Sequence, residues 1–168
     1  DVDAIAPGRG DALVGKDMVN AAIENTRDFV DTTYKAAAKV LVPTNGKLGV
    51  SWTGSPSSEP FDTTGWLSGS TGVGYDRATT YDSLIGVDVG RQMRSNTSVY
   101  IRIDFDVSDP ALVDLLELRM KYDDGFVAFL NGEQLVSANS PTSPRWNSSA
   151  RVAHGANPRT YIKFDVSD

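Results

Sequence analysis

The stretch LLELRMKYDDGFVAFLNGEQLVS, residues 115–137, decides the fold class of this 168-residue chain. Apolar and charged side chains alternate over residues 116–122, with the two-residue period of a strand that has one buried face. Residues 126–130 are all apolar, which is typical of a central strand. Asp123-Asp124-Gly125 and Asn131-Gly132 are turn signals, and Asn-Gly is the strongest short hairpin signal. The stretch predicts three consecutive antiparallel strands, a β-meander within one sheet.

The composition excludes several classes of function. The net charge is −6, which argues against a nucleic-acid partner, since phosphate binding requires clustered Lys and Arg. The chain has no cysteine, which excludes disulfides, thiolate chemistry and sulfur-ligated zinc. No apolar run reaches membrane-spanning length, so no membrane span is expected. A length of 168 residues is enough for one domain with a proper core.

The N-terminal part has a different pattern from the rest. Residues 1–15 contain Pro and several Gly without periodicity, which predicts a linker. From Asp17 to about Lys39, apolar residues recur at three- and four-residue steps, which predicts an amphipathic helix with Asp17 as N-cap. This helix either packs on a sheet face or closes a preceding domain. The predicted division is residues 1–39, linker plus helix, and residues 40–168, a β-sandwich.

The clearest strand is residues 98–107, SVYIRIDFDV. One face carries Val99, Ile101, Ile103, Phe105 and Val107, and the other carries Tyr100, Arg102, Asp104 and Asp106, the alternation of a strand with two different faces.

Aromatic residues set among Gly, Ser and Thr form the candidate ligand site. Tryptophan and tyrosine beside polar turns offer flat surfaces on which sugar rings stack, and an adjacent Arg can add a planar contact. The alternative is that each aromatic ring anchors its own loop to the core. The candidate residues are Trp52, Trp66, Tyr75, Tyr81, Arg145 and Trp146.

Four blocks of the chain, residues 65–76, 98–110, 118–141 and 145–150, together resemble a jelly-roll module. The module occurs in very large secreted bacterial proteins of planctomycete type, beside spore-coat-kinase-like (CotH) and lamin-tail domains. It is similar to galactose-binding-like and carbohydrate-binding β-sandwiches. The resemblance covers roughly residues 40–168. It implies an antiparallel jelly-roll sandwich, located outside the cell or on its surface, that binds a polysaccharide or glycan or displays neighbouring domains.

Asp123 and Asp124 resemble the calcium-holding pair of lectin-like PA14 sandwiches, in which calcium bridges protein and sugar hydroxyls. Calcium takes six to eight oxygen ligands, so Asn131 or distant carboxylates would have to converge on the pair. The alternative is a plain hairpin turn in which Asp caps its own backbone. Residues adjacent in a tight turn are expected to point apart, which argues against a pair of carboxylates for glycoside hydrolysis.

No catalytic residues are predicted. His154 has no nucleophile to serve, and the chain has no Gly-x-Ser-x-Gly elbow. The leading expectation is a non-catalytic extracellular module that binds carbohydrate with the help of calcium. Because the family continues past the motif at residues 164–167 with further strands, we also expect an open sheet edge. The alternative function is a structural subunit or spacer of a surface assembly, whose identical subunits pair at that edge.

Overall fold

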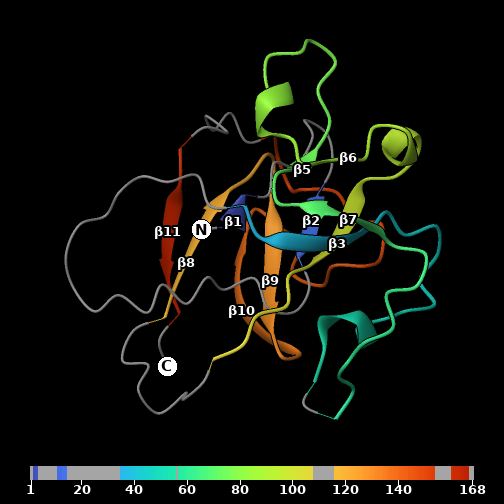
Figure 1. The fold of residues 1–168 in the computed structure, drawn as a ribbon, viewed down its shortest axis with the longest axis vertical. Coiled ribbons are helices and arrows are strands. Elements are labelled where there is room, and N and C mark those ends of the chain that lie inside the picture. Colours follow the sequence, from blue (N-terminus) through green and yellow to red (C-terminus); the bar gives the residue numbers. More distant parts are fainter. Residues whose placement is uncertain are drawn as a thin grey trace.

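The computed structural model describes residues 2–3, 11–14, 35–55, 57–107, 116–153 and 160–166, with side chains from residue 35 onward (Figure 1). Strands make up most of the regular structure in these ranges, in agreement with the predicted all-β class, and their helices are short 3₁₀ turns, none of which could cross a membrane. In chain order the elements are β1 (Val2–Asp3), β2 (Asp11–Val14), β3 (Ala37–Leu41), η1 (Ser51–Thr53), β4 (Leu67–Ser70), β5 (Val73–Gly74), η2 (Asp82–Leu84), β6 (Val87–Asp88), η3 (Gln92–Arg94), β7 (Ser98–Arg102), β8 (Glu117–Lys121), β9 (Phe126–Leu130), β10 (Glu133–Ala138) and β11 (Ile162–Asp165).

The main sheet of the described residues has six strands in the order β10-β9-β2-β7-β3-β4. β2 runs parallel to both β7 and β9, and the other neighbours are antiparallel. The sheet is therefore mixed, which corrects the prediction of antiparallel strands throughout. It also corrects the prediction of a linker over residues 1–15, because β1 and β2 lie in sheets. Neither strand has the length that makes an alternating pattern visible in a sequence.

The predicted meander is wrong at its first turn. β9 and β10 form the expected hairpin, with Leu130 opposite Glu133, but β8 lies in a three-stranded sheet between β1 and β11. Residues 123–125 therefore connect two sheets. The side chains explain why: Leu118 and Met120 give β8 one buried face, whereas β9 is apolar on both faces and requires cover on each side.

The main core lies between these two sheets and beside the pair β5-β6. The predicted alternation is confirmed at its start, since Val99 and Ile101 of β7 and Ile103 just after it are buried in this core. β7 ends at Arg102, so the strand is shorter than the predicted range 98–107, and Phe105 and Val107 are only half-buried. The core also contains residues from β3, β8, β9 and the segment around β5 and β6, namely Ala38, Val40, Val73, Val87, Leu118, Met120, Phe126 and Ala128.

A second apolar cluster covers the opposite face of the main sheet. Tyr100 and Val127 project from β7 and β9 and pack with Trp52 from η1. Half-buried residues complete this cluster: Leu41, Leu48, Phe61, Trp66, Phe129 and Trp146. The segments 44–55 and 57–66, drawn in blue-green at the lower right of Figure 1, therefore form a layer over the sheet.

The predicted helix over residues 17–39 falls largely outside the described residues. Its last three positions, 37–39, are wrong, because β3 begins at Ala37 and pairs with β7 on one side and β4 on the other. Ala38 and Val40 are buried while Ala37 is exposed, which is the two-residue alternation of a strand. Lys39 consequently projects from β3, the strand next to the edge strand β4, on the face that carries the second cluster.

The described sheets are open rather than closed into a barrel. β10 and β4 stand at the two ends of the six-stranded order, and β1 and β11 at the ends of the three-stranded order. β10 carries an irregularity in register between Gln134 and Val136, a device that disfavours pairing with another strand.

Candidate functional site

An open cleft of about 600 Å³ lies beside the second cluster, between the β3-β4 edge of the main sheet and the loop that precedes β4. Its volume falls in the range of small-molecule sites. Lys39 and Ser68 form the wall on the sheet, and Trp66 and Phe61 supply the aromatic surface. The remaining lining residues are Pro60, Asp62, Thr63, Thr64 and Gly65.

The aromatic side of the cleft is held from beneath. The Trp66 indole meets the Phe61 ring edge to face, with centroids 6.0 Å apart and planes at 74°. The guanidinium carbon of Arg102 lies 4.9 Å from the Phe61 ring centroid, within the range of a cation–π contact. Arg102, Phe61 and Trp66 thus form a series of contacts from the buried face of the sheet to the cleft.

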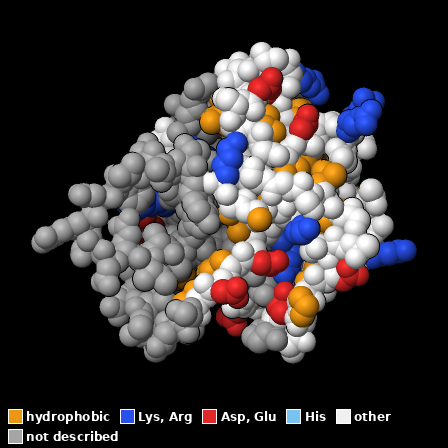
Figure 2. All heavy atoms as spheres, in the orientation of Figure 1, with side chains coloured by type: hydrophobic (Ala, Val, Ile, Leu, Met, Phe, Trp, Pro, Cys, Tyr) orange, Lys and Arg blue, Asp and Glu red, His pale blue; other side chains and the backbone are white. Residues whose placement is uncertain are grey.

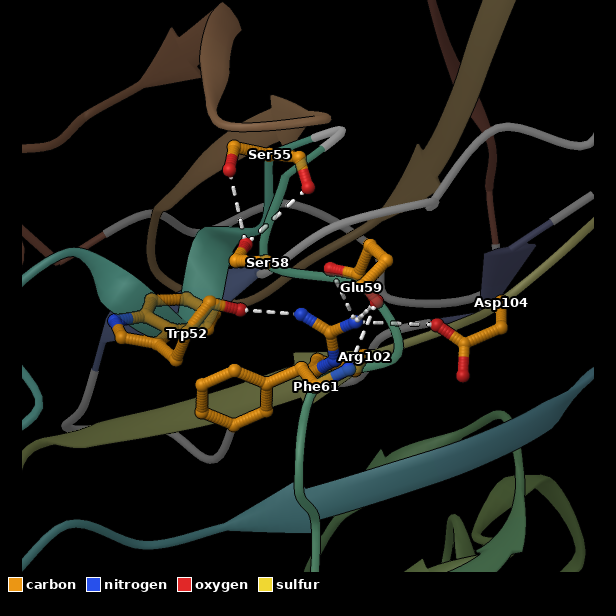
Figure 3. Close-up of polar contacts among 7 residues, drawn as sticks. All are labelled: Trp52, Ser55, Ser58, Glu59, Phe61, Arg102 and Asp104. Carbon is orange, nitrogen blue, oxygen red and sulfur yellow. Dashed lines mark hydrogen bonds and ion pairs between the residues drawn. The ribbon is translucent and has the colours of Figure 1, made fainter.

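Arg102 is fixed by ion pairs and hydrogen bonds in the interior (Figure 3). It is 1% exposed, and its Nη1 donates to the Trp52 carbonyl at 2.7 Å. Its Nη2 lies 2.9 Å from Glu59 Oε2 and 3.3 Å from Asp104 Oδ1. Among the described residues, Arg102 Nε is a buried side-chain nitrogen without a hydrogen-bond partner. The contacts of Arg102 with Glu59 and Trp52 connect the layer formed by residues 44–55 and 57–66 to β7.

The polar side of the cleft is ordered by short local hydrogen bonds. Asp62 Oδ1 accepts from the Thr64 amide at 2.8 Å. Hydrogen bonds from the Thr64 side chain and backbone lower the pKa of Asp62 below its usual value. Lys39 Nζ donates to Ser68 Oγ at 2.8 Å, across two strands in which these residues are directly opposed. The cleft therefore combines hydroxyl, carboxylate and ammonium groups beside an indole.

Of the predicted aromatic residues, only Trp66 lines this cleft. The interpretation of Trp52 as a ligand contact is wrong, because its side chain is 2% exposed and stacks on Tyr100 with ring centroids 4.0 Å apart. Trp146 packs against the second cluster, and a Cβ at Gly46 would lie 2.8 Å from its Cδ1, so the indole rests on that backbone. Arg145 is exposed.

Tyr75 and Tyr81 belong to a different part of the molecule, the connection that runs from β5 to η2; this connection forms the loop at the top of Figure 1. Tyr75 packs against the main core, and the Arg77 guanidinium lies 5.9 Å from its ring centroid. The Tyr81 amide donates to Asp76 Oδ2 at 2.7 Å. The six candidate residues are thus divided between two ends of the protein and do not form one site.

Asp123 and Asp124 lie together in the connection between β8 and β9. Asp124 is 8% exposed, and its carboxyl group is near enough to act on that of Asp123. Burial, and then the charge and hydrogen bond of Asp124, raise the pKa of Asp123 to about 6. Two carboxyl groups held this closely favour a proton or a cation between them.

Asn131 does not join this pair. It follows the far end of β9, roughly 17 Å away for a five-residue strand, next to Gly132, whose backbone approaches the Gly54 carbonyl. Asn139 is nearer, since its Nδ2 donates to the Asp124 carbonyl at 3.1 Å. Within the ranges that the structure describes, no group of three or more His, Cys, Asp or Glu side chains could hold a metal. Calcium at Asp123 and Asp124 would take its remaining oxygens from carbonyls, amides or water.

The sequence analysis missed Lys39, Phe61 and most of the cleft loop. The signal for the loop was present in residues 59–66, EPFDTTGW, where an Asx turn and a Gly separate two aromatic residues. Lys39 carries no such signal, because the helical pattern of the sequence extends to about this residue.

Comparison of the chain with protein-family models, with curated proteins and with solved structures finds no significant match.

Proposed function

We propose that this protein is a non-catalytic carbohydrate-binding module and that the cleft beside Trp66 is its binding site. One observation carries the proposal: an indole is held at the edge of an open cleft whose other walls are hydroxyl and charged groups. Pyranose rings have apolar C–H faces that stack on aromatic rings and hydroxyl edges that require polar partners. The support of Trp66 by Phe61 and Arg102 holds the indole in place before a ligand arrives, which reduces the entropy lost on binding.

The family and location are part of the same proposal. Resemblance of the four sequence blocks to secreted jelly-roll modules supports a jelly-roll-type sandwich outside the cell or on its surface. The two sheets that share one apolar core are compatible with a sandwich. The parallel pairings of β2 require a variation on an antiparallel jelly roll. The helix proposed for residues 17–34 rests on the sequence pattern alone.

Calcium binding at Asp123 and Asp124 is a separate element of this proposal. Their carboxyl groups are close enough to share a hydrogen bond, and the raised pKa of Asp123 reflects a charge that lacks compensation. A bound calcium ion would offset the charge of Asp123, and sugar hydroxyls could occupy its remaining coordination positions. In a thermal melt at pH 7.5, calcium should raise the Tm of the wild-type chain and leave the Tm of Asp123→Asn unchanged. An equal shift with magnesium, or no shift, would remove calcium from the proposal.

A structural role is the second candidate, and the open ends of both sheets favour it. In that case identical subunits or neighbouring domains would pair along an edge such as β11, where Ile162 is exposed. The native mass of the purified chain, measured over a range of concentrations, distinguishes the two candidates. A mass of one chain throughout favours the binding module, and a mass of several chains favours the subunit.

The decisive experiment is retention on a panel of immobilised polysaccharides. We expect the wild-type chain to be retained by at least one polysaccharide and Trp66→Ala to lose that retention. Trp146→Ala is the matched control, because it removes the same ring from outside the cleft. Failure of the wild type on every polysaccharide would contradict the proposed function. Loss with Trp146→Ala but not with Trp66→Ala would place the site elsewhere.

A further inference from the structure

The wall of the cleft formed by the main sheet carries a row of three polar side chains from adjacent strands. Ser68 on β4 is directly opposite Lys39 on β3, and Lys39 is directly opposite Arg102 on β7. Directly opposed residues in neighbouring strands project on the same face of a sheet. The two cations therefore stand side by side, Arg102 beneath the loop of residues 59–61 and Lys39 within the cleft.

The charges around these two cations are unequally matched. Arg102 is paired with both Glu59 and Asp104. Lys39 has a hydrogen bond to the Ser68 hydroxyl and no ion pair with any residue that the structure describes. No described carboxylate therefore neutralises the charge of the Lys39 ammonium group in the cleft.

The acidic groups nearby are already engaged. Asp62, the carboxylate that lines the cleft, accepts from the Thr64 amide at 2.8 Å. Glu59 Oε2 accepts from the Phe61 amide at 3.0 Å in addition to its contact with Arg102. Figure 2 shows acidic side chains gathered over the lower half of the described surface, with basic side chains beside them. Each of these carboxylates therefore has donors on the protein, whereas Lys39 has no anionic partner among the described residues.

We propose that the cleft recognises carboxylate-bearing sugars, that is, uronates, with the sugar carboxylate on Lys39 Nζ and the ring face on Trp66. This inference rests on the proposed carbohydrate-binding function and names its ligand class. Lys39 supplies charge-assisted hydrogen bonds, which are stronger than those between neutral groups. Ser68 fixes the position of the ammonium group. One ammonium group beside hydroxyls matches one carboxylate on a sugar better than it matches a densely charged sulfated polymer.

The test compares each acidic oligosaccharide with its own methyl ester, which removes the charge and keeps the sugar. Oligogalacturonate, oligomannuronate and oligoguluronate are titrated by calorimetry at pH 7.5 in chelator, so that calcium cannot bridge the ligand to Asp123 and Asp124. We expect at least one acid to bind about tenfold more tightly than its ester. Lys39→Met should remove most of that difference by weakening the binding of the acid far more than that of the ester, since Met keeps the packing of the Lys stem and removes the charge. Lys39→Arg should restore part of the difference.

Other results overturn the inference in distinguishable ways. Equal affinity for acid and ester, or an equal effect of Lys39→Met on both, would show that the carboxylate is not recognised. Binding of neutral polysaccharides alone would overturn the uronate assignment and leave the carbohydrate-binding function standing. Binding of dextran sulfate as tight as that of the uronates would replace it by a general affinity for polyanions. Absence of binding to any glycan, acidic or neutral, would overturn the proposed function as well.

Discussion

The indole of Trp52 lies flat on the ring of Tyr100, with centroids 4.0 Å apart and planes 7° apart. Phe129 meets the same indole edge to face at 6.1 Å. Burial raises the pKa of Tyr100 to about 12, as expected for a phenol whose ionised form would lose its water. This stack joins the 3₁₀ turn η1 to the strands β7 and β9. Trp52 is buried, whereas Trp66, further along the same layer, lines the cleft.

Replacement of Trp52 by Ala should therefore lower the free energy of unfolding by about 3–5 kcal/mol, as for other large aromatic residues removed from a core. Trp66→Ala removes the same ring from a half-buried position and should cost less than half as much. Urea denaturation followed by far-UV circular dichroism measures both values. Equal losses would contradict the division between core and cleft.

Arg102→Met should lower the free energy of unfolding by about 3 kcal/mol, because it leaves the Glu59 carboxylate near the interior without its partner. Adding Glu59→Gln to this variant should recover part of the loss, since the remaining charge is then removed. Arg102→Lys should not rescue stability, because an ammonium group cannot reach both Trp52 and Glu59 with a planar fork. A double-mutant cycle in urea measures the coupling, and strictly additive losses would mean that the pair is not coupled.

Gly72 and Gly49 both have positive φ, 70° and 51°, but differ in the space around them. A Cβ at Gly72 would lie 1.8 Å from the Leu84 carbonyl oxygen, whereas a Cβ at Gly49 meets nothing within 4 Å. Gly49→Ala should cost about 1–2 kcal/mol, the usual strain of left-handed backbone. Gly72→Ala should lower the free energy of unfolding by clearly more, because the backbone must move to separate the new Cβ from the Leu84 carbonyl oxygen. Thermal melts of the two variants provide the measurement, and similar Tm values would contradict the close approach.

The pH dependence of stability should carry a signature of Asp123. Its pKa is raised from 3.8 to about 6, so the folded chain binds a proton that the unfolded chain releases. Stability should therefore fall as pH rises from about 4 to about 6 and change no further from this group above that range. Relative to the wild type, the free energy of unfolding of Asp123→Asn should rise by about 1 kcal/mol when the pH is raised from 4 to 7.5, allowing for solvent screening of the partly exposed Asp123. Urea titrations in chelator at both pH values test this, and a gain of the same size at pH 4 would contradict it.

Local patterns predicted local structure correctly. The Asn131-Gly132 turn has φ of 51° and 93° and closes the β9–β10 hairpin as its sequence indicates. The alternation in residues 98–102 assigned Val99 and Ile101 to the main core and Tyr100 to the opposite face. Each of these features depends on neighbouring residues or on a period of two.

The partner of each strand could not be predicted in the same way. The alternation in β8 shows that one face is buried but not which sheet buries it, and residues 123–125 suit a hairpin as well as a connection between sheets. Ala37 and Lys39 continue a helical period by composition, yet β4 and β7 both pair with this segment, and tertiary pairing overrides local preference.

The candidate site was predicted only in part for the same reason. Trp66 has the local signal of an aromatic residue in a polar turn, but so does Trp52, and only the positions of β7 and β9 show which ring is covered. Lys39 reaches the cleft because Ser68 lies opposite it in the sheet, a relationship between residues on two strands.

The position of β2 has a kinetic consequence. Asp11–Val14 lies between β7 and β9, where Val14 is opposite both Ile101 and Ala128, residues separated from it by more than half the chain. The six-stranded sheet cannot be completed until these distant segments have met, and the loop-closure entropy is lost before the pairing compensates for it. We therefore expect refolding on the slow, millisecond-to-second scale of proteins with long-range β pairing, with insertion of residues 11–14 as a late event.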